Sequence, residues 1–321
     1  MNDGNHSGIV SVQSTVATLT AEYMLHVFPR YAENTKKQIR IELQRFALFV
    51  GQREINGKIL HEFMAFRFAK TSKAWTLNGT VQWVNAFLVW CEEMGYLTKK
   101  YSSILRPVKV PKTPPLRFSH QQFEAVKQAA KGTCWHYAVC MAYRTGARMS
   151  DVCLLKWENV DMDTLIIRYV PFKSRKTGRY ATCPFQAGGD LHEALLELAQ
   201  ARSKTPFRNE LVCPELAMRY PVDGYCGIDG KGMIMDFHKI RVKAGVPRLT
   251  FHKLRNSFMS RIVDGGVSFP IASQLTGLAS VQTFLAYAKP DAAVLRTAIE
   301  TVDSKDNPPQ EPGAIISMPA A

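Results

Sequence analysis

The sequence predicts a mainly α-helical protein with a small β-sheet, an α+β fold in which a helical N-terminal domain precedes a mixed α/β domain. Apolar residues recur at helical spacing over most of the chain, and β-rich runs replace them only near residues 163–185. A proline-rich stretch, 105–117, separates the two parts. At 321 residues, two domains are expected rather than one.

The N-terminal domain is expected over residues 15–104, after a polar and flexible start at 1–14. A helix is predicted near 34–52, capped by Asn34 or Thr35 and ended by Gly51. Further helices are predicted at 58–70 and 77–97, with a stop near Gly95. The apolar stripes that should face the core are Ile39, Leu43, Phe46 and Val50, followed by Val81, Val84, Phe87, Leu88 and Cys91.

The segment 105–117 is predicted to be an extended domain linker, because four prolines forbid a helix there. Its charges are all positive: Arg106, Lys109, Lys112 and Arg117. Two roles remain open at this point, a simple spacer or a strap that lies along a phosphate backbone.

The second domain is expected over residues 118–303, with a disordered tail at 304–321. Ser119 and Gln122 can form a capping box ahead of its first helix. The β-rich runs 164–170 and 179–185 flank a polar turn with Gly178 and predict a hairpin. Helices are predicted at 136–146, 190–202, 236–245, 251–265, 270–277 and 280–289, whereas the Gly- and Pro-rich stretch 205–235 has no clear pattern.

The charge balance points to a polyanionic partner. Lys and Arg exceed Asp and Glu by 14, and the isoelectric point is near 9.5. Nucleic acid is the first expectation and an anionic membrane surface the second, although a merely basic protein would have the same balance. The sequence has no secretory signal pattern and no apolar run long enough to span a bilayer, which weakens the membrane alternative.

Seven cysteines occur without any Cys-x-x-Cys pair: Cys91, Cys134, Cys140, Cys153, Cys183, Cys213 and Cys226. Neither a disulfide framework nor a zinc site is predicted, and reduced thiols in a cytoplasmic protein fit better. We therefore expect no metal and no cofactor.

Several polar residues are candidates for chemistry, although each also has an ordinary structural explanation. Arg148 and Asp151 lie in a helix–helix turn and would usually form a structural ion pair. His252 and Arg255 share one helix face, which alone suggests a half-buried helix end. Tyr287 alone suggests a core or surface tyrosine. The basic tip of the hairpin, which would usually be a solvated loop, contains Lys173, Arg175, Lys176 and Arg179.

Taken in order, these elements resemble the tyrosine recombinases, also called phage-type integrases. Intervals of 28, 76, 3 and 32 residues separate Arg148, Lys176, His252, Arg255 and Tyr287. The stretches that resemble family motifs are TGARMSDVCLLKW, KTGRYATCP, HKLRNSF and LTGLASVQTFLAYAK. The resemblance covers nearly the whole chain and implies a helical core-binding domain, the linker and a catalytic domain.

The resemblance also implies roles for the individual residues. Tyr287 would attack the scissile phosphorus and form a 3′-phosphotyrosine, while Arg148 and Arg255 clamp the phosphate oxygens. Lys176 would protonate the leaving 5′ oxygen, with His252 assisting and Asp151 orienting Arg148. DNA contacts are expected from Lys36, Lys37 and Arg40 and from the basic residues of the linker and the hairpin tip.

Two positions depart from the family pattern. After Gly277, where the family usually has a histidine or tryptophan donor, this chain has Leu278, which has no side-chain donor. Asn256 replaces a histidine that is often found there, which looks minor. Alternatives to a recombinase are a type IB topoisomerase-like relaxing enzyme and a catalytically silent DNA-binding protein of the same fold.

The resemblance further implies double-stranded recombination sites as the substrate and a homotetramer on DNA, with an accessory directionality protein as a further partner. The protein is expected to be cytoplasmic and DNA-associated. The family does not specify whether DNA is integrated, excised or resolved.

Overall fold

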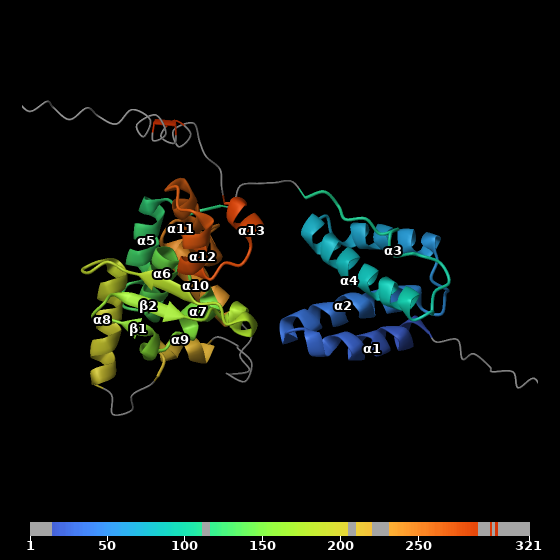
Figure 1. The fold of residues 1–321 in the computed structure, drawn as a ribbon, viewed down its shortest axis with the longest axis horizontal. Coiled ribbons are helices and arrows are strands. Elements are labelled where there is room, and N and C mark those ends of the chain that lie inside the picture. Colours follow the sequence, from blue (N-terminus) through green and yellow to red (C-terminus); the bar gives the residue numbers. More distant parts are fainter. Residues whose placement is uncertain are drawn as a thin grey trace, which may run out of the picture. The chain divides into compact units, whose positions relative to one another are not determined.

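The computed structural model describes residues 15–110, 116–204, 210–219 and 231–287, together with 296, 299 and 300. It consists of two compact units, Met1–Lys112 and Thr113–Ala321, each described here by itself (Figure 1). The division falls within the predicted linker 105–117. The segments predicted to be flexible, 1–14 and 304–321, lie outside the described residues.

The described part of the first unit is entirely helical (Figure 1). Both predicted apolar stripes are buried in one core, which confirms the helical spacing seen in the sequence. The elements are α1 (Val16–Val27), a 3-10 helix (Phe28–Arg30), α2 (Glu33–Val50), α3 (Gly57–Lys70) and α4 (Ala74–Glu93).

The predicted start of α2 was wrong. The helix begins at Glu33, and Ala32 stands at the N-cap position without a side-chain cap. The Glu33 carboxylate in the first turn complements the positive end of the helix dipole and pairs with Lys36 Nζ at 2.6 Å. Charge thus replaces the polar cap that was expected from Asn34 or Thr35. The predicted end at Gly51 is confirmed.

The beginning of the predicted linker is attached to the first unit. Leu105 is buried in the core of this unit, and its carbonyl accepts a hydrogen bond from Asn85 Nδ2 at 2.9 Å. The Asn78 carboxamide bonds both backbone groups of Val108, at 2.7 and 2.9 Å. The chain therefore leaves this unit only after Val108.

The second unit combines nine helices, within the described residues, with a small sheet (Figure 1). The predicted capping box is confirmed, because Ser119 and Gln122 bond each other's backbone N–H groups at 3.0 and 3.2 Å. The helices are α5 (His120–Ala130), α6 (Cys134–Thr145), α7 (Met149–Cys153), α8 (Asp190–Ser203), α9 (Pro214–Arg219), α10 (Lys231–Lys243), α11 (His252–Asp264), α12 (Phe269–Thr276) and α13 (Val281–Leu285).

The sheet has the antiparallel order β1-β2-β3, with β1 (Val160–Asp161), β2 (Ile166–Tyr169) and β3 (Ala181–Pro184). The predicted hairpin is β2–β3, and Ile167 lies opposite Cys183 in its register. Two features were not predicted. The two-residue strand β1 is too short to show a period, and the connection is a 3-10 helix, Phe172–Thr177, rather than a simple turn.

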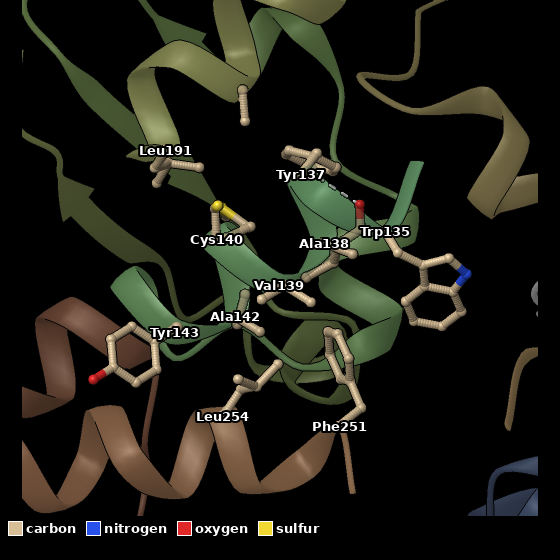
Figure 2. Close-up of a cluster of buried hydrophobic side chains, with 14 of the residues drawn as sticks. Trp135, Tyr137, Ala138, Val139, Cys140, Ala142, Tyr143, Leu191, Phe251 and Leu254 are labelled. Atoms are coloured by element: carbon tan, nitrogen blue, oxygen red, sulfur yellow. Dashed lines mark hydrogen bonds between the residues drawn. The ribbon is translucent and has the colours of Figure 1, made fainter. Parts of the chain in front are cut away.

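The core of the second unit is built around α6, which is buried along most of its length. Figure 2 shows Leu254 of α11 and Phe251, the N-cap residue of α11, directed towards this helix. Leu254 is fully buried and Phe251 nearly so. Burial of each such side chain stabilises the fold by roughly 1.5–3 kcal/mol. This packing fixes α11, which also carries His252 and Arg255.

Candidate active site

The turn that precedes Arg148 requires glycine. Gly146 ends α6 with φ +70°, a left-handed conformation that glycine adopts without strain. A Cβ atom at this position would lie 2.5 Å from Cδ1 of Phe258 on α11. Gly146 thus permits both the turn and the close approach of α11, and Arg148 follows as the N-cap residue of α7.

Asp151 holds this turn through the backbone. Its side chain is completely buried, and Oδ2 accepts a hydrogen bond from the Arg148 N–H at 3.1 Å. Oδ1 accepts from the Phe172 N–H at 2.7 Å, at the start of the hairpin connection. The Arg148 guanidinium is more distant, with Nη1 3.8 Å from Oδ2. Asp151 therefore ties the arginine turn to the lysine-bearing segment.

Arg255 is almost completely buried, and its Nη1 donates a hydrogen bond to the carbonyl of Gly146. Burial lowers the pKa of Arg255, and the charge of Arg148 lowers it further, against the opposing effects of Tyr169, Tyr287 and Asp151. Arg148 Nη1 is also buried and has no hydrogen-bond partner among the described residues. Two neighbouring guanidiniums and an unused donor are together suited to binding an anion.

His252 lies in the first turn of the same helix with its side chain exposed. Desolvation lowers the pKa of His252, and the positive charges of Arg255, Lys253, Arg148 and Lys173 lower it further. The imidazole is therefore held in its neutral form at neutral pH. A neutral ring has one nitrogen that donates and one that accepts a proton.

Lys176 is exposed on the 3-10 helix between β2 and β3 and forms no hydrogen bond or ion pair with a described residue. Its neighbour Lys173 is exposed too, yet the charge of Lys173 acts on His252. Arg175 stacks on Phe172, with its guanidinium carbon 4.0 Å from the ring centroid. The hairpin thus offers two candidate lysines rather than one.

Tyr287 follows directly after α13 and is half-buried. Its hydroxyl donates to Asn256 Oδ1 over 3.4 Å, and Asn256 is the residue after Arg255 on α11. The ring packs against the buried cluster that includes Met259, Phe284 and Leu278. The tyrosine is therefore held against the helix that bears Arg255.

Leu278 points into that cluster and is buried. Its backbone carbonyl accepts hydrogen bonds from Ser273 Oγ at 2.7 Å and from Arg179 Nη1 at 3.3 Å. Gly277 before it has φ +63°, and a Cβ there would lie 2.6 Å from Pro171 Cγ. The Leu278 side chain is part of the core, and Arg179 of the hairpin donates a hydrogen bond to the Leu278 carbonyl.

The structure thus links five of the predicted site residues by contacts and charges: Arg148, Asp151, His252, Arg255 and Tyr287. No hydrogen bond or ion pair among the described residues connects Lys176 to these five. The sequence prediction missed Lys173 as a neighbour of His252, and it treated Asn256 as minor although this residue contacts Tyr287. The signals for Asn256 in the sequence were its position next to Arg255 and its replacement of a histidine that is often found there.

The basic residues expected to contact DNA lie at the surface where they are described. Lys36 pairs with Glu33, Arg40 lies 5.2 Å from the centroid of the Phe28 ring, and Arg117 pairs with Asp264 at 2.6 Å. The remaining exposed ones are Lys37, Arg106, Lys109, Lys173, Arg175 and Arg179. Lys112 lies outside the described residues.

No described helix has the length and apolar character needed to cross a membrane. In the same part of the chain, no three His, Cys, Asp or Glu side chains come together in a way that could hold a metal ion. The six described cysteines are free thiols, and Cys226 lies outside the described residues.

Comparison with known proteins identifies the chain. A family model described as the phage integrase family matches residues 117–293, more than half of the sequence. The chain belongs to the phage integrase family. The resemblance stated from the motifs is thereby confirmed. The match begins at the end of the predicted linker and includes every residue of the site.

Relatives of this integrase-family chain include two named tyrosine recombinases. Tyrosine recombinase XerC of Staphylococcus saprophyticus is 22% identical over 280 residues, which are 81% of this chain and 88% of the relative. A "Tyrosine recombinase XerC-like" protein of Caldanaerobacter subterraneus is 22% identical over 244 residues, or 67% of this chain. The match spans 62% of that second protein, less than two thirds of its length.

Solved structures show the same fold. A lambda integrase dimer bound to a COC′ core site matches with a TM-score of 0.68 and 17% identity, covering 86% of this chain and 99% of that chain. A lambda integrase tetramer bound to a Holliday junction matches with a TM-score of 0.66 and 18% identity, covering 86% and 83%. The predicted fold class, mainly helical with a small sheet, is confirmed.

Proposed function

We propose that this protein is a site-specific recombinase that cuts and rejoins double-stranded DNA through a covalent bond to Tyr287. One observation carries the proposal. Arg255 is buried beside Arg148, whose buried Nη1 has no hydrogen-bond partner among the described residues, and Tyr287 is held against the same helix as Arg255. Two like charges are stable in such a place when an anion lies between them, and a phosphodiester is that anion.

In the proposed reaction, the Tyr287 oxygen attacks the phosphorus and forms a P–O bond while the bond to the 5′ oxygen breaks. The DNA 3′ end becomes a phosphotyrosine, and the released 5′ oxygen takes up a proton as a hydroxyl. The phosphoryl energy is retained in the new ester, so the reverse attack by a 5′-hydroxyl rejoins a strand. Negative charge that grows on the non-bridging oxygens is stabilised by Arg148 and Arg255.

Two proton transfers accompany this step. The phenol loses a proton, which the neutral His252 imidazole can accept, because its pKa is lowered by desolvation and by neighbouring cations. The leaving oxygen gains a proton from a lysine of the hairpin. Lys176 is the residue that the family resemblance assigns, and Lys173 is the residue whose charge acts on His252.

The proposed substrate is bound mainly through its phosphates, since the chain carries a net charge of +14. Affinity should fall steeply as salt rises, whatever the DNA sequence. The basic segment between the units and the hairpin tip are the proposed backbone contacts. Because a lambda integrase of this fold forms a tetramer on a Holliday junction, we also propose a tetramer on DNA.

The test is capture of the covalent intermediate. The purified protein is incubated with a library of nicked duplex fragments from the DNA that flanks its own gene, in which a cut strand cannot be rejoined. Protein–DNA adducts are isolated under denaturing conditions and sequenced. We expect adducts at a few discrete sites, and none with Tyr287→Phe.

Tyr96→Phe is the matched control, because Tyr96 is exposed and belongs to the first unit, away from the site residues. Adducts that survive Tyr287→Phe, or a wild-type protein that forms none, would overturn the proposal. Incubation of the captured site with a synthetic junction separates the two enzyme classes, since a recombinase resolves the junction whereas a relaxing topoisomerase only removes supercoils.

A further inference from the structure

The side chain of Asn256 is buried between the hydroxyl of Tyr287 and the backbone carbonyl of Leu116. Asn256 lies on α11, one residue after Arg255, and is only 5% exposed. Oδ1 lies 3.4 Å from the hydroxyl of Tyr287, and Nδ2 lies 3.5 Å from the backbone carbonyl of Leu116. Both contacts are at the long end of the hydrogen-bonding range, but they come from opposite ends of one rigid carboxamide.

The Leu116 carbonyl decides which way this amide faces. A carbonyl oxygen only accepts hydrogen bonds, so the NH₂ end of Asn256 must face it and the oxygen must face Tyr287. The reverse orientation would place two oxygens against each other. Before the proposed proton transfer to His252, the phenol hydrogen is thereby directed to Oδ1, which leaves the lone pairs of the phenol oxygen available on its other sides.

Leu116 belongs to the end of the segment that joins the two units. The next residues are fastened to the same helix, since the Phe118 N–H donates to Ser257 Oγ at 2.7 Å and Arg117 pairs with Asp264 at 2.6 Å. Ser257 is the residue after Asn256. The attachment of the segment and the orientation of the Asn256 amide therefore depend on adjacent positions of one helix.

We propose that Asn256 is a positioning residue that places the Tyr287 hydroxyl beside Arg255 only while the segment 116–118 is attached to α11. This inference rests on the proposed function, in which Tyr287 is the nucleophile. In this proposal the linker affects the position of the nucleophile, which a simple spacer would not do. Attachment or release of residues 116–118 is transmitted through Leu116 and Asn256 to the attacking oxygen.

The first test separates positioning from binding. The cleavage rate constant is measured in single turnover at saturating nicked duplex, and the Kd for the same duplex is measured separately. Asn256→Leu keeps the size but loses both polar contacts. We expect its cleavage rate to fall about tenfold with an unchanged Kd, since one hydrogen bond contributes about 1 kcal/mol and misplacement adds to this.

Two further variants show which contact matters. A neutral histidine has one acceptor and one donor, so Asn256→His should restore the cleavage rate to within about threefold of wild type. Asn256→Asp can accept from Tyr287 but cannot donate to Leu116, and it should remain slow. Thermal unfolding shows whether each variant folds. If Asn256→Leu does not fold, the cleavage rates of Asn256→His and Asn256→Asp still test the proposal.

The role of the linker is tested by a double-mutant cycle. Ser257→Ala removes the acceptor of the Phe118 N–H and should slow cleavage in the wild-type background. In the Asn256→Leu background it should have no further effect on the cleavage rate, because the two changes act through the same path. Additive losses, or a loss confined to Kd, would overturn the proposal.

A spectroscopic readout keeps this result distinct from failure of the proposed function. In DNA-free protein labelled at the tyrosine Cζ, the Tyr287 resonance should move in Asn256→Leu and stay near its wild-type position in Asn256→His. If the resonance behaves so but wild-type protein forms no adduct, the nucleophile assignment is wrong although the contact exists. If the resonance does not respond, the positioning role itself is overturned.

Discussion

The site has two sides that differ in how firmly the protein holds them. The arginine side, consisting of the turn Gly146–Asp151 and helix α11, is buried: Asp151 is completely enclosed and Arg255 is 3% exposed. The lysine side, residues 172–180 between β2 and β3, is exposed at every position from Arg175 to Tyr180. Among the described residues, a hydrogen bond from the Phe172 N–H to Asp151 Oδ1 connects the two sides.

Under the proposed mechanism, the difference follows from what each side would do. Groups that stabilise developing charge are most effective when they are fixed before the reaction, which requires burial and backbone support. A lysine that protonates a leaving oxygen needs only to reach it, and DNA itself can complete its position. The comparison predicts that removing a site side chain on the arginine side affects both stability and chemistry, whereas removing an exposed side chain on the lysine side affects chemistry alone.

The largest expected effect is on the lysine side. Lys176→Ala should slow strand cleavage by roughly 10²–10⁴-fold, the usual range for loss of a general acid, with an unchanged melting temperature. DNA with sulfur in place of the scissile 5′ oxygen should restore the rate, because a thiol with a pKa of about 8.5 leaves without a proton.

Lys173→Ala is the matched control, since both lysines are exposed on the same short helix. A sulfur-rescued defect in Lys173→Ala and none in Lys176→Ala would move the proton-donor role to Lys173. Equal melting temperatures for both variants are required by the comparison of the two sides.

On the arginine side, Arg255→Ala should slow cleavage by roughly 10²–10³-fold, or about 3–4 kcal/mol in the barrier. It should also lower the melting temperature, because the buried Gly146 carbonyl loses its donor. Sulfur-substituted DNA should give no rescue, since the lost group stabilises the phosphate and not the leaving oxygen. An unchanged melting temperature would contradict the contrast between the sides.

Two glycine variants, one on each side of the site, compare the effect of the same substitution on the free energy of unfolding. Gly146→Ala and Gly178→Ala both place a side chain at positive φ, which destabilises by roughly 1–2 kcal/mol. At Gly146 the new methyl group also meets Phe258, whereas at Gly178 nothing lies within 4 Å. Gly146→Ala should be less stable by roughly a further 1–3 kcal/mol in denaturant unfolding. Equal losses of stability in the two variants would mean that α11 can move away from the turn at Gly146.

The smallest expected effect concerns His252. Desolvation lowers its pKa from 6.5, and the charge of Lys253 adds to this, so Lys253→Gln should raise the pKa while Lys131→Gln leaves it unchanged. Titration of the ring resonances by NMR measures both. Because the folded protein binds this proton less tightly than the unfolded chain, His252 lowers stability as pH falls below about 6.5.

Much of the fold was predictable because it depends on local pattern. The stripe from Ile39 to Val50 and the capping box of Ser119 and Gln122 follow from spacing alone, and both are present. The β2–β3 hairpin followed from a change of period. Strand β1 and the start of α2 could not be predicted, since a two-residue strand has no period and Glu33 replaces a capping side chain by charge.

The sequence by itself determined the residue types of the site and their order, because catalysis needs those chemical groups and local spacing reveals them. Only the tertiary structure decided how each is held. Burial of Arg255, the contact of Asn256 with Tyr287 and the inward side chain of Leu278 depend on packing between distant segments. Such packing arises when α11 meets α6 and the segment 116–118, and no local sequence pattern specifies it.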